Sequence, residues 1–350
     1  MNRRTNGRAF TLVEILVVIS IIGILISLLT VGIQKAIETG KASKDQSRAR
    51  QLIVAWQQYG NNNGDQCLPG YLSPAVQTAW KVKYQNQNGN PLAPELAQTY
   101  GWRLAAFLGY EYDPFLGYRD TAETNLDESL YYSDMEYEPT LPAAFSGVTG
   151  LAGAGLSLQP GFGYNAYYLG GWWNVDPAIG IPAYRFRDSI YQDNGANVRG
   201  KIVARSIGQI ARSSEMIVFS SSALRPAGLY IEDSDTYPGA AWSVPPRLGA
   251  TEIWRMGGGN LQGVDLALFG EHDALSAVLS PSPAPAPAPV PMQAGGLEIL
   301  VQEAAPLLRY GANATISNAD GSTGLVNLRD LMDMRRWANG ATTPNWSHGD

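Results

Sequence analysis

A long apolar stretch near the amino terminus is the strongest pattern in the chain. It reads RAFTLVEILVVISIIGILISLLTVGI over residues 8–33, and between Ala9 and Gln34 only Glu14 is ionisable. As a helix, the twenty residues 10–29 would be about 30 Å long at roughly 1.5 Å per residue, which matches the hydrocarbon core of a bilayer. The pattern therefore predicts a transmembrane helix over residues 10–31.

The helical pattern continues beyond the apolar stretch. Apolar residues recur at spacings of three and four, with charged residues on the other faces. We expect one helix over residues 10–60, roughly 75 Å long to Tyr59, which ends where Gly60 meets the tract NNNGD. Its second half is amphipathic, which predicts packing against a globular head. The recurring apolar positions are Ile33, Ala36, Ile37, Ala49, Leu52, Ile53, Trp56 and Tyr59.

An ordinary secretory signal is the alternative interpretation of this terminus. The first residues, MNRRTNGRA, form a short basic stretch that is typical of such signals. Signal peptides, however, have an apolar run of only about 7 to 15 residues, followed by a small-x-small cleavage site. Here the run is longer, and the one such site, Thr30-Val31-Gly32, is poor. Basic residues flank both ends of the stretch, so charge alone leaves its orientation open.

The composition predicts a substantial acidic head. With 350 residues, 45% of them hydrophobic, the chain can bury a sizeable core. Its net charge of -6 argues against nucleic acid as a main partner. Cys67 is the single cysteine, so the chain can form no internal disulfide. The 38 Gly, 22 Pro, 18 Tyr and 9 Trp favour a loop-rich head that contains β-strands.

Residues 9–14, AFTLVE, resemble the prepilin processing motif of type IV pilins and type II secretion pseudopilins. The resemblance implies a leader peptide over residues 1–9, removed by a prepilin peptidase/methyltransferase that cuts between Ala9 and Phe10. It also implies N-methylation of Phe10 and a role in filament assembly for Glu14, which becomes the fifth mature residue. The family usually has Gly before the cut, so Ala9 departs from its pattern.

The chemistry of Glu14 agrees with this resemblance. An ionised carboxylate in hydrocarbon costs at least about 2.5 kcal/mol, so an intramembrane acid usually has a partner. Cleavage would place the ammonium group of Phe10 four residues from Glu14. The two could pair in one helix or, as the family implies, between neighbouring subunits. The alternative is an acid at the membrane interface of an ordinary anchor.

Weaker resemblances continue along the expected extracytoplasmic head, residues 61–350. Four segments are similar to parts of long pilin-like proteins: the helix exit at 59–64 with Leu68-Pro69, then residues 102–109, 163–170 and 328–337. They imply an α+β pilin-like fold, with the second half of the long helix packed on an antiparallel β-sheet and with extended loops. The residues themselves predict a turn into a buried strand over 207–221 and another strand over 264–269.

A proline-rich segment, SPSPAPAPAPVP, occupies residues 280–291. Such a run favours an extended polyproline II conformation and cannot join the interior of a sheet. We expect a stiff exposed loop. A ligand for a proline-binding module is the alternative.

Catalytic and metal-binding patterns are weak. The sequence contains no serine-hydrolase elbow and no phosphate-binding loop, and its two histidines are His272 and His348, the second expected to be solvated. The acidic clusters EDSD at 232–235 and EHD at 271–273 offer oxygen ligands that suit calcium. A solvated loop is the better interpretation of both, and we expect no cofactor.

An aromatic cluster suggests a binding surface. Trp172 and Trp173 follow Tyr164, Tyr167 and Tyr168 closely in the sequence. Exposed together, these rings would form a platform for a sugar or a partner protein. Most such aromatic residues, however, anchor a core or a loop.

These patterns predict a structural, non-catalytic subunit of a type II secretion pseudopilus or a type IV pilus-like filament. The expected partners are other copies and other pilin-like subunits, the prepilin peptidase/methyltransferase, an inner-membrane assembly platform and membrane lipid, but not nucleic acid. The expected location is the inner membrane, crossed once, with the head outside the cytoplasm. The first alternative is a tethered or minor-pilin module that binds glycan, and the second is an anchored hydrolase that uses head carboxylates.

Overall fold

The architecture comes from a computed structural model of the chain. Its residues fall into two compact units, 1–43 and 44–350. The boundary lies within helix α1 (Leu12–Asn62), so the two parts of this helix belong to different units. The described residues are 12–117, 153–158, 160–176, 179–193, 196–199, 202–224, 237–249, 251–252, 304–306, 308, 310 and 313–348.

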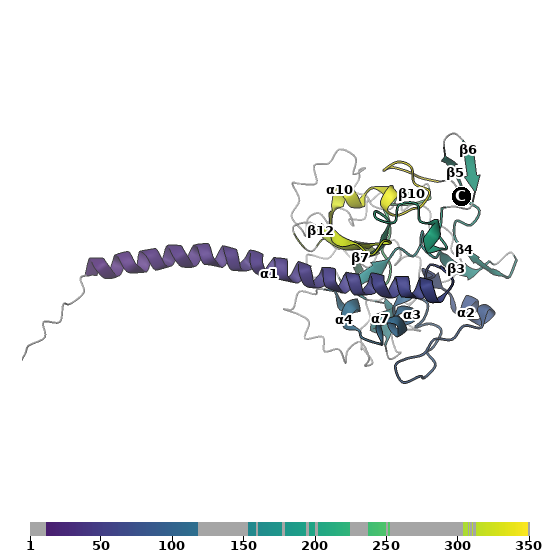
Figure 1. Cartoon of the computed structure of the whole chain (residues 1–350), viewed down its shortest axis with the longest axis horizontal. Coiled ribbons are helices and arrows are strands. Elements are labelled where there is room, and N and C mark those ends of the chain that lie inside the picture. The colour runs from purple at the N-terminus through teal and green to yellow at the C-terminus, as the bar shows by residue number, and fades with distance from the viewer. Residues whose placement is uncertain are drawn as a thin grey trace, which may run out of the picture. The chain divides into compact units, whose positions relative to one another are not determined.

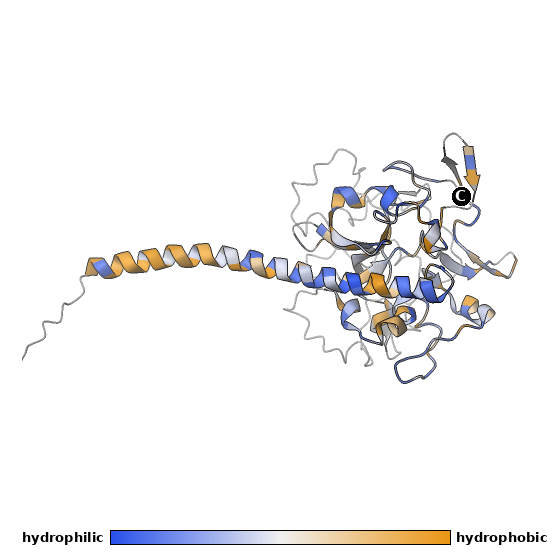
Figure 2. Cartoon of the chain, viewed as in Figure 1, coloured by the Kyte–Doolittle hydropathy of each residue, from blue (hydrophilic) through white to orange (hydrophobic). Residues whose placement is uncertain are grey.

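Helix α1 is a single element of 51 residues (Figure 1). No proline interrupts the sequence from residue 12 to residue 62, and most residues of its first half are Leu, Ile or Val. Figure 2 shows the change in character along the helix, from mostly hydrophobic colour in its first half to mixed polar and apolar colour further on. The structure thus has the long N-terminal helix that the periodicity predicts.

Gly60 does not end the helix, contrary to the sequence prediction. It lies within α1, which continues to Asn62, where the Asn63 side chain donates a hydrogen bond to the Tyr59 carbonyl at 2.8 Å. A Cβ on Gly60 would lie 2.3 Å from Cδ1 of Ile207. The glycine therefore lets the Ile207 side chain approach the helix closely, and a larger residue would have to displace that side chain.

The larger sheet of the head is antiparallel and is organised around β7 (Ile217–Leu224). β7 pairs with four strands: β12 (Asn313–Asn318), β11 (Ala304–Pro306), β2 (Phe162–Tyr164) and β8 (Tyr237–Pro238). β13 (Thr323–Asn327) extends the sheet beyond β12. The predicted turn and buried strand at 207–221 are confirmed as the 3-10 helix η3 (Ile207–Gln209) followed by β7.

A smaller sheet contains the one departure from antiparallel pairing among the named strands of the described residues. β1 (Tyr71–Leu72) pairs in parallel with β3 (Trp172–Val175), which pairs antiparallel with β4 (Pro182–Tyr184). Two hairpins complete the strands: β5 (Ile190–Asp193) with β6 (Ala196–Arg199), and β9 (Arg247–Leu248) with β10 (Thr251–Glu252).

Short helices fill the space between the strands and carry many of the buried aromatic residues. Tyr100 and Trp102 belong to α3 and Phe115 to α4, and all three side chains are buried. The helices are α2 (Pro74–Trp80), α3 (Tyr100–Ala105), η1 (Ala106–Leu108), α4 (Asp113–Leu116), α7 (Ala154–Leu158), α10 (Leu328–Leu331) and η5 (Met334–Arg336).

The second half of α1 packs on the larger sheet. Leu52, Ile53 and Trp56 are fully buried and share one core cluster with Phe219 of β7 and Ile316 of β12. A pilin-like α+β arrangement, with a long helix on an antiparallel sheet, is therefore what the chain forms. The predicted strand at 264–269 and the proline-rich segment 280–291 lie outside the described residues.

Candidate assembly helix

Glu14 lies in the first turn of α1. A helix begins with free backbone N–H groups and a partial positive charge, so an acid there is stabilised electrostatically. The predicted cleavage and methylation residues, Ala9 and Phe10, lie outside the described residues. The structure therefore places the predicted assembly acid at the start of the helix, and cleavage and methylation stay predictions.

The first half of α1 exposes its apolar side chains on every face. Every large apolar residue from Leu12 to Leu29 is between 47% and 82% exposed. Ile33 and Ile37, which continue the apolar pattern, are also about half exposed, at 49% and 52%. Such a surface is unfavourable in water, because roughly 25 cal/mol is lost for each square ångström of apolar area left exposed. This segment requires lipid or protein around it.

The hydroxyl groups of this segment need no external partner. Ser20 donates to the Leu16 carbonyl, Ser27 to the Ile24 carbonyl and Thr30 to the Ile26 carbonyl, each at 2.8 Å. Such bonds to the preceding turn satisfy a hydroxyl within the helix itself. A carboxylate accepts hydrogen bonds only, so the carbonyls of the helix cannot serve Glu14 in the same way. Glu14 is thus the chemically distinct position of the apolar half.

No other helix among the described residues has this character. By length and composition, α1 is the single helix there that could cross a membrane, and its most apolar window is not buried within the chain. Gly23 and Gly32 both lie within α1. A Cβ added to either glycine would meet nothing within 4 Å. Packing inside the chain therefore does not explain these two glycines.

The second half of α1 is fixed by a buried hydrogen-bond chain. Trp56 Nε1 donates to the Tyr164 hydroxyl at 3.0 Å, and that hydroxyl donates to the Leu68 carbonyl at 2.8 Å. Gln57 donates to the carbonyl of Ala319, which follows β12, at 3.0 Å. Helix, sheet and helix exit are tied together by these bonds. Burial raises the pKa of Tyr164 well above its usual value, so its hydroxyl keeps its proton and can donate.

A polar cluster secures α1 one turn after the boundary between the units. Arg48 makes a two-pronged ion pair with Asp113 of α4, with Nε 3.1 Å from Oδ2, and donates to the Gly117 carbonyl at 2.9 Å. Asp45, fully buried, accepts a hydrogen bond from the Tyr310 hydroxyl at 3.0 Å. The hydrogen bond from Arg48 holds the pKa of Asp113 below its usual value. Periodicity alone did not identify these partners, because both come from distant segments.

The aromatic cluster forms no exposed platform, and the interpretation of these rings as core anchors is confirmed. Trp172 is 2% and Trp173 9% exposed, and Tyr164, Tyr167 and Tyr168 are at most 1% exposed. The Trp172 ring stacks on Tyr71 at 4.3 Å and on Tyr167 at 5.0 Å between ring centroids. These rings are core, because the parallel pairing of β1 with β3 brings residues 71 and 172 together.

His348 is buried, not solvated as its place near the C-terminus suggested. It is 2% exposed and lies against Tyr168, Phe186 and Trp346, with the Phe186 ring centroid at 4.6 Å. Its Nε2 lies 3.5 Å from the Tyr168 hydroxyl. Aromatic packing thus holds Trp346 and His348 to the head.

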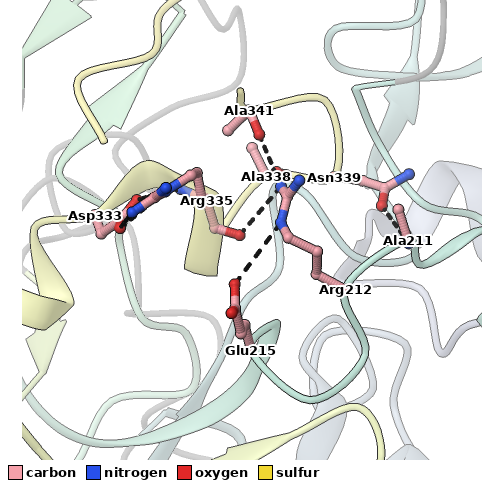
Figure 3. Close-up of polar contacts among 8 residues, drawn as sticks. All are labelled: Ala211, Arg212, Glu215, Asp333, Arg335, Ala338, Asn339 and Ala341. Atoms are coloured by element: carbon pink, nitrogen blue, oxygen red, sulfur yellow. Dashed lines mark hydrogen bonds and ion pairs between the residues drawn. The ribbon is translucent and has the colours of Figure 1, made fainter. Parts of the chain in front are cut away.

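The buried Arg103 and the partly exposed Arg212 organise the head, and neither had a recognisable sequence signal. Arg103 is fully buried and donates to the carbonyls of Thr99, Pro69, Gly70 and Gln98. Arg212 connects the turn before β7 to the C-terminal segment (Figure 3), where it donates to the Ala341 carbonyl at 2.8 Å. In the same region Asn339 accepts from the Ala211 N–H and donates to the Gln209 carbonyl. Their partners are backbone carbonyls, which a sequence motif cannot reveal.

A metal site finds no support in the part of the chain that the structure describes, since no three His, Cys, Asp or Glu side chains there gather around a common point. Both acidic clusters considered for calcium, 232–235 and 271–273, and also His272, lie outside the described residues. Burial raises the pKa of the Cys67 thiol to about 12, so this thiol is neutral and unreactive at neutral pH.

Comparison with known proteins gives one match, and this match covers the beginning of the long helix. No curated protein and no solved structure shows significant similarity to the chain. Residues 4–30 match the family model described as the prokaryotic N-terminal methylation motif. The match covers the basic start, the AFTLVE segment and most of the exposed apolar surface. The chain therefore carries the prepilin-type N-terminal signal that is the hallmark of type IV pilins and pseudopilins.

Proposed function

We propose that this protein is a structural subunit of a type II secretion pseudopilus or a type IV pilus-like filament. The observation that carries the proposal is the apolar half of α1, a methylation-motif helix whose large side chains are about half exposed or more and whose one acid is Glu14. Before assembly this surface is covered by lipid, and in the filament by the same helix of other subunits. The chain acts by packing and performs no catalysis.

The proposed maturation step creates a positive charge four residues before Glu14. A prepilin peptidase/methyltransferase cuts between Ala9 and Phe10 and methylates the new amine. The ammonium group of Phe10 in one subunit then pairs with Glu14 of a neighbour. Apolar packing alone specifies little in a membrane, so a charge pair selects the register of the helices.

The proposed location follows from the same helix. The chain crosses the inner membrane once, with its head outside the cytoplasm, and is transferred into the filament by an inner-membrane assembly platform. Other copies and other pilin-like subunits are its partners in the filament. Glycan recognition by Trp172 and Trp173 is not favoured, because both rings are buried.

The test compares Glu14→Ala with the native chain and with Glu38→Ala, an exposed acid of the same helix beyond the apolar stretch. Both variants are expected in the membrane fraction with a normal mature N-terminus. Filaments sheared from producing cells should contain the native chain and Glu38→Ala but lack Glu14→Ala.

Mass spectrometry of the mature chain tests the processing step separately. The expected N-terminal residue is a methylated Phe10. Intact residues 1–9, or cleavage near Gly32, would contradict the proposal, as would normal filament incorporation of Glu14→Ala.

A further inference from the structure

A surface with aromatic and basic side chains lies on the head beside the smaller sheet. Trp80, the last residue of α2, is 38% exposed, and its ring meets Trp173 edge-on, with 4.7 Å between ring centroids. The guanidinium carbon of the exposed Arg205 lies 5.4 Å from the ring centroids of both Trp173 and Tyr184. These four residues define the Trp80–Arg205 surface, in which Trp173 supports an exposed ring and an exposed charge.

The charge of Arg205 is not neutralised within the described chain. No carboxylate there forms an ion pair with Arg205, and the same holds for Lys81, the exposed residue that follows Trp80. Arg187 differs, because it pairs with the neighbouring Asp188 at 3.0 Å. Aromatic stacking leaves the planar N–H fork of a guanidinium available for a carboxylate.

These residue types suit a protein partner. Trp, Tyr and Arg dominate the binding energy at protein interfaces, above all where they are packed against each other. A partner that complements Arg205 has to present carboxylates. The chain itself has an excess of carboxylates, with 31 acidic against 25 basic residues. A second copy therefore has the required chemistry.

Charge also decides the geometry of such a contact. If two copies met through the same surface, Arg205 would face Arg205, which is unfavourable. The surface must therefore meet a different, acidic face of the second copy, which makes the contact heterologous. Heterologous contacts that do not close into a ring generate helical filaments.

We infer that the Trp80–Arg205 surface binds a carboxylate-bearing face of a second copy of this chain, as a heterologous contact between heads. The inference rests on the proposed function and names the part of the head through which assembled subunits touch. It adds a polar contact between heads to the apolar packing of the helices.

Site-specific crosslinking tests the identity of the partner. The single native thiol, Cys67, is buried, so a photocrosslinker can be attached selectively to Lys83→Cys, an exposed position near Trp80 in the sequence. In assembled full-length protein, the expected product has the mass of two subunits, and its peptides come from this chain alone.

Charge reversal tests the contribution of Arg205. Arg205→Glu is expected to lower both crosslink yield and filament incorporation at least about tenfold, as a residue worth more than 1.4 kcal/mol would. Arg187→Glu, at a partly exposed arginine that already pairs with Asp188, should change crosslink yield and filament incorporation less than about twofold. Trp80→Phe keeps an aromatic ring, so its losses of crosslink yield and filament incorporation should lie between those of the two arginine variants. Thermal unfolding of each variant checks that the head stays folded.

The outcomes separate this inference from the proposed function. Assembly lost in Glu14→Ala but unchanged in Arg205→Glu, with equal crosslink yield, would overturn the head contact alone. Crosslinks to another protein, or retention of the native chain on alginate beads that depends on Arg205 without any self-crosslink, would overturn it too. A native chain that forms no filaments and no self-crosslink would overturn both proposals.

Discussion

The two parts of α1 have the same secondary structure and opposite surroundings. Ile24 and Ile53 belong to one continuous helix, yet Ile24 is 62% exposed and Ile53 is fully buried. In the second part, polar residues occupy the outer faces and the apolar face is covered by the sheet. In the first part, the apolar surface extends around the helix. The second part therefore folds with its own head, whereas the first part is completed by other molecules.

Apolar residues therefore serve two different purposes within the same helix. Leu52, Ile53 and Trp56 contribute to the stability of the head, because their burial is intramolecular. Leu12 to Leu29 contribute to location and assembly, because their burial occurs only in lipid or against other subunits. A substitution of the same kind should consequently have different effects in the two parts.

The largest predicted effect comes from two matched substitutions of isoleucine by alanine, one in each part of α1. Ile53→Ala should lower the free energy of unfolding of the head by about 2–5 kcal/mol, since it leaves a cavity in a close-packed core. Ile24→Ala should change it by less than about 0.5 kcal/mol. Denaturant unfolding of the full chain in detergent, followed by tryptophan fluorescence, measures both changes in the free energy of unfolding. Equal losses would show that the two parts share one core.

The polar cluster around Arg48 tests whether polar contacts, in addition to apolar packing, hold the second part of α1 to the head. Arg48→Met should destabilise the head by about 1–3 kcal/mol, because the buried Asp45 loses a neighbouring cation and the Gly117 carbonyl loses its donor. Arg50→Met, an exposed arginine on the same helix, is the control and should be nearly neutral. The same unfolding measurement applies. A neutral Arg48→Met would mean that apolar packing alone holds the helix.

The smallest predicted effect is a pH dependence at Asp113. Arg48 depresses the pKa of Asp113 in the folded state, so the pair stabilises the head above about pH 4, the unfolded value, and this contribution is lost as pH falls through the folded value. Asp113 is 47% exposed, so the effect should stay below about 1 kcal/mol.

Comparing the unfolding of native and Asp113→Asn chains between pH 7 and pH 2 isolates the contribution of the Arg48–Asp113 pair. Asp333, whose pKa is also lowered, is present in both chains and cancels. The native chain should lose more stability on acidification. Parallel curves for the two chains would refute a stabilising role for the pair.

Local periodicity was sufficient to predict the helix, because spacings of three and four between apolar residues are a property of neighbours in sequence. The buried run at 216–219 likewise predicted β7. Gly60, by contrast, was taken as a stop signal, whereas in the structure it lies inside the helix, where the Ile207 side chain approaches it closely. The same limitation applies to Trp172 and His348, whose burial depends on segments far away in the chain.

The sequence by itself determined the long helix, its apolar half and the acid in its first turn, since all three depend on residues close together along the chain. Only the tertiary structure decided which aromatic residues are buried, which arginines are paired, and that Trp80 and Arg205 share one surface. Residues 80 and 205 meet on Trp173 because β1, which directly precedes α2 in the chain, pairs with β3. That juxtaposition arises from strand pairing between distant segments, for which no local pattern carries a signal.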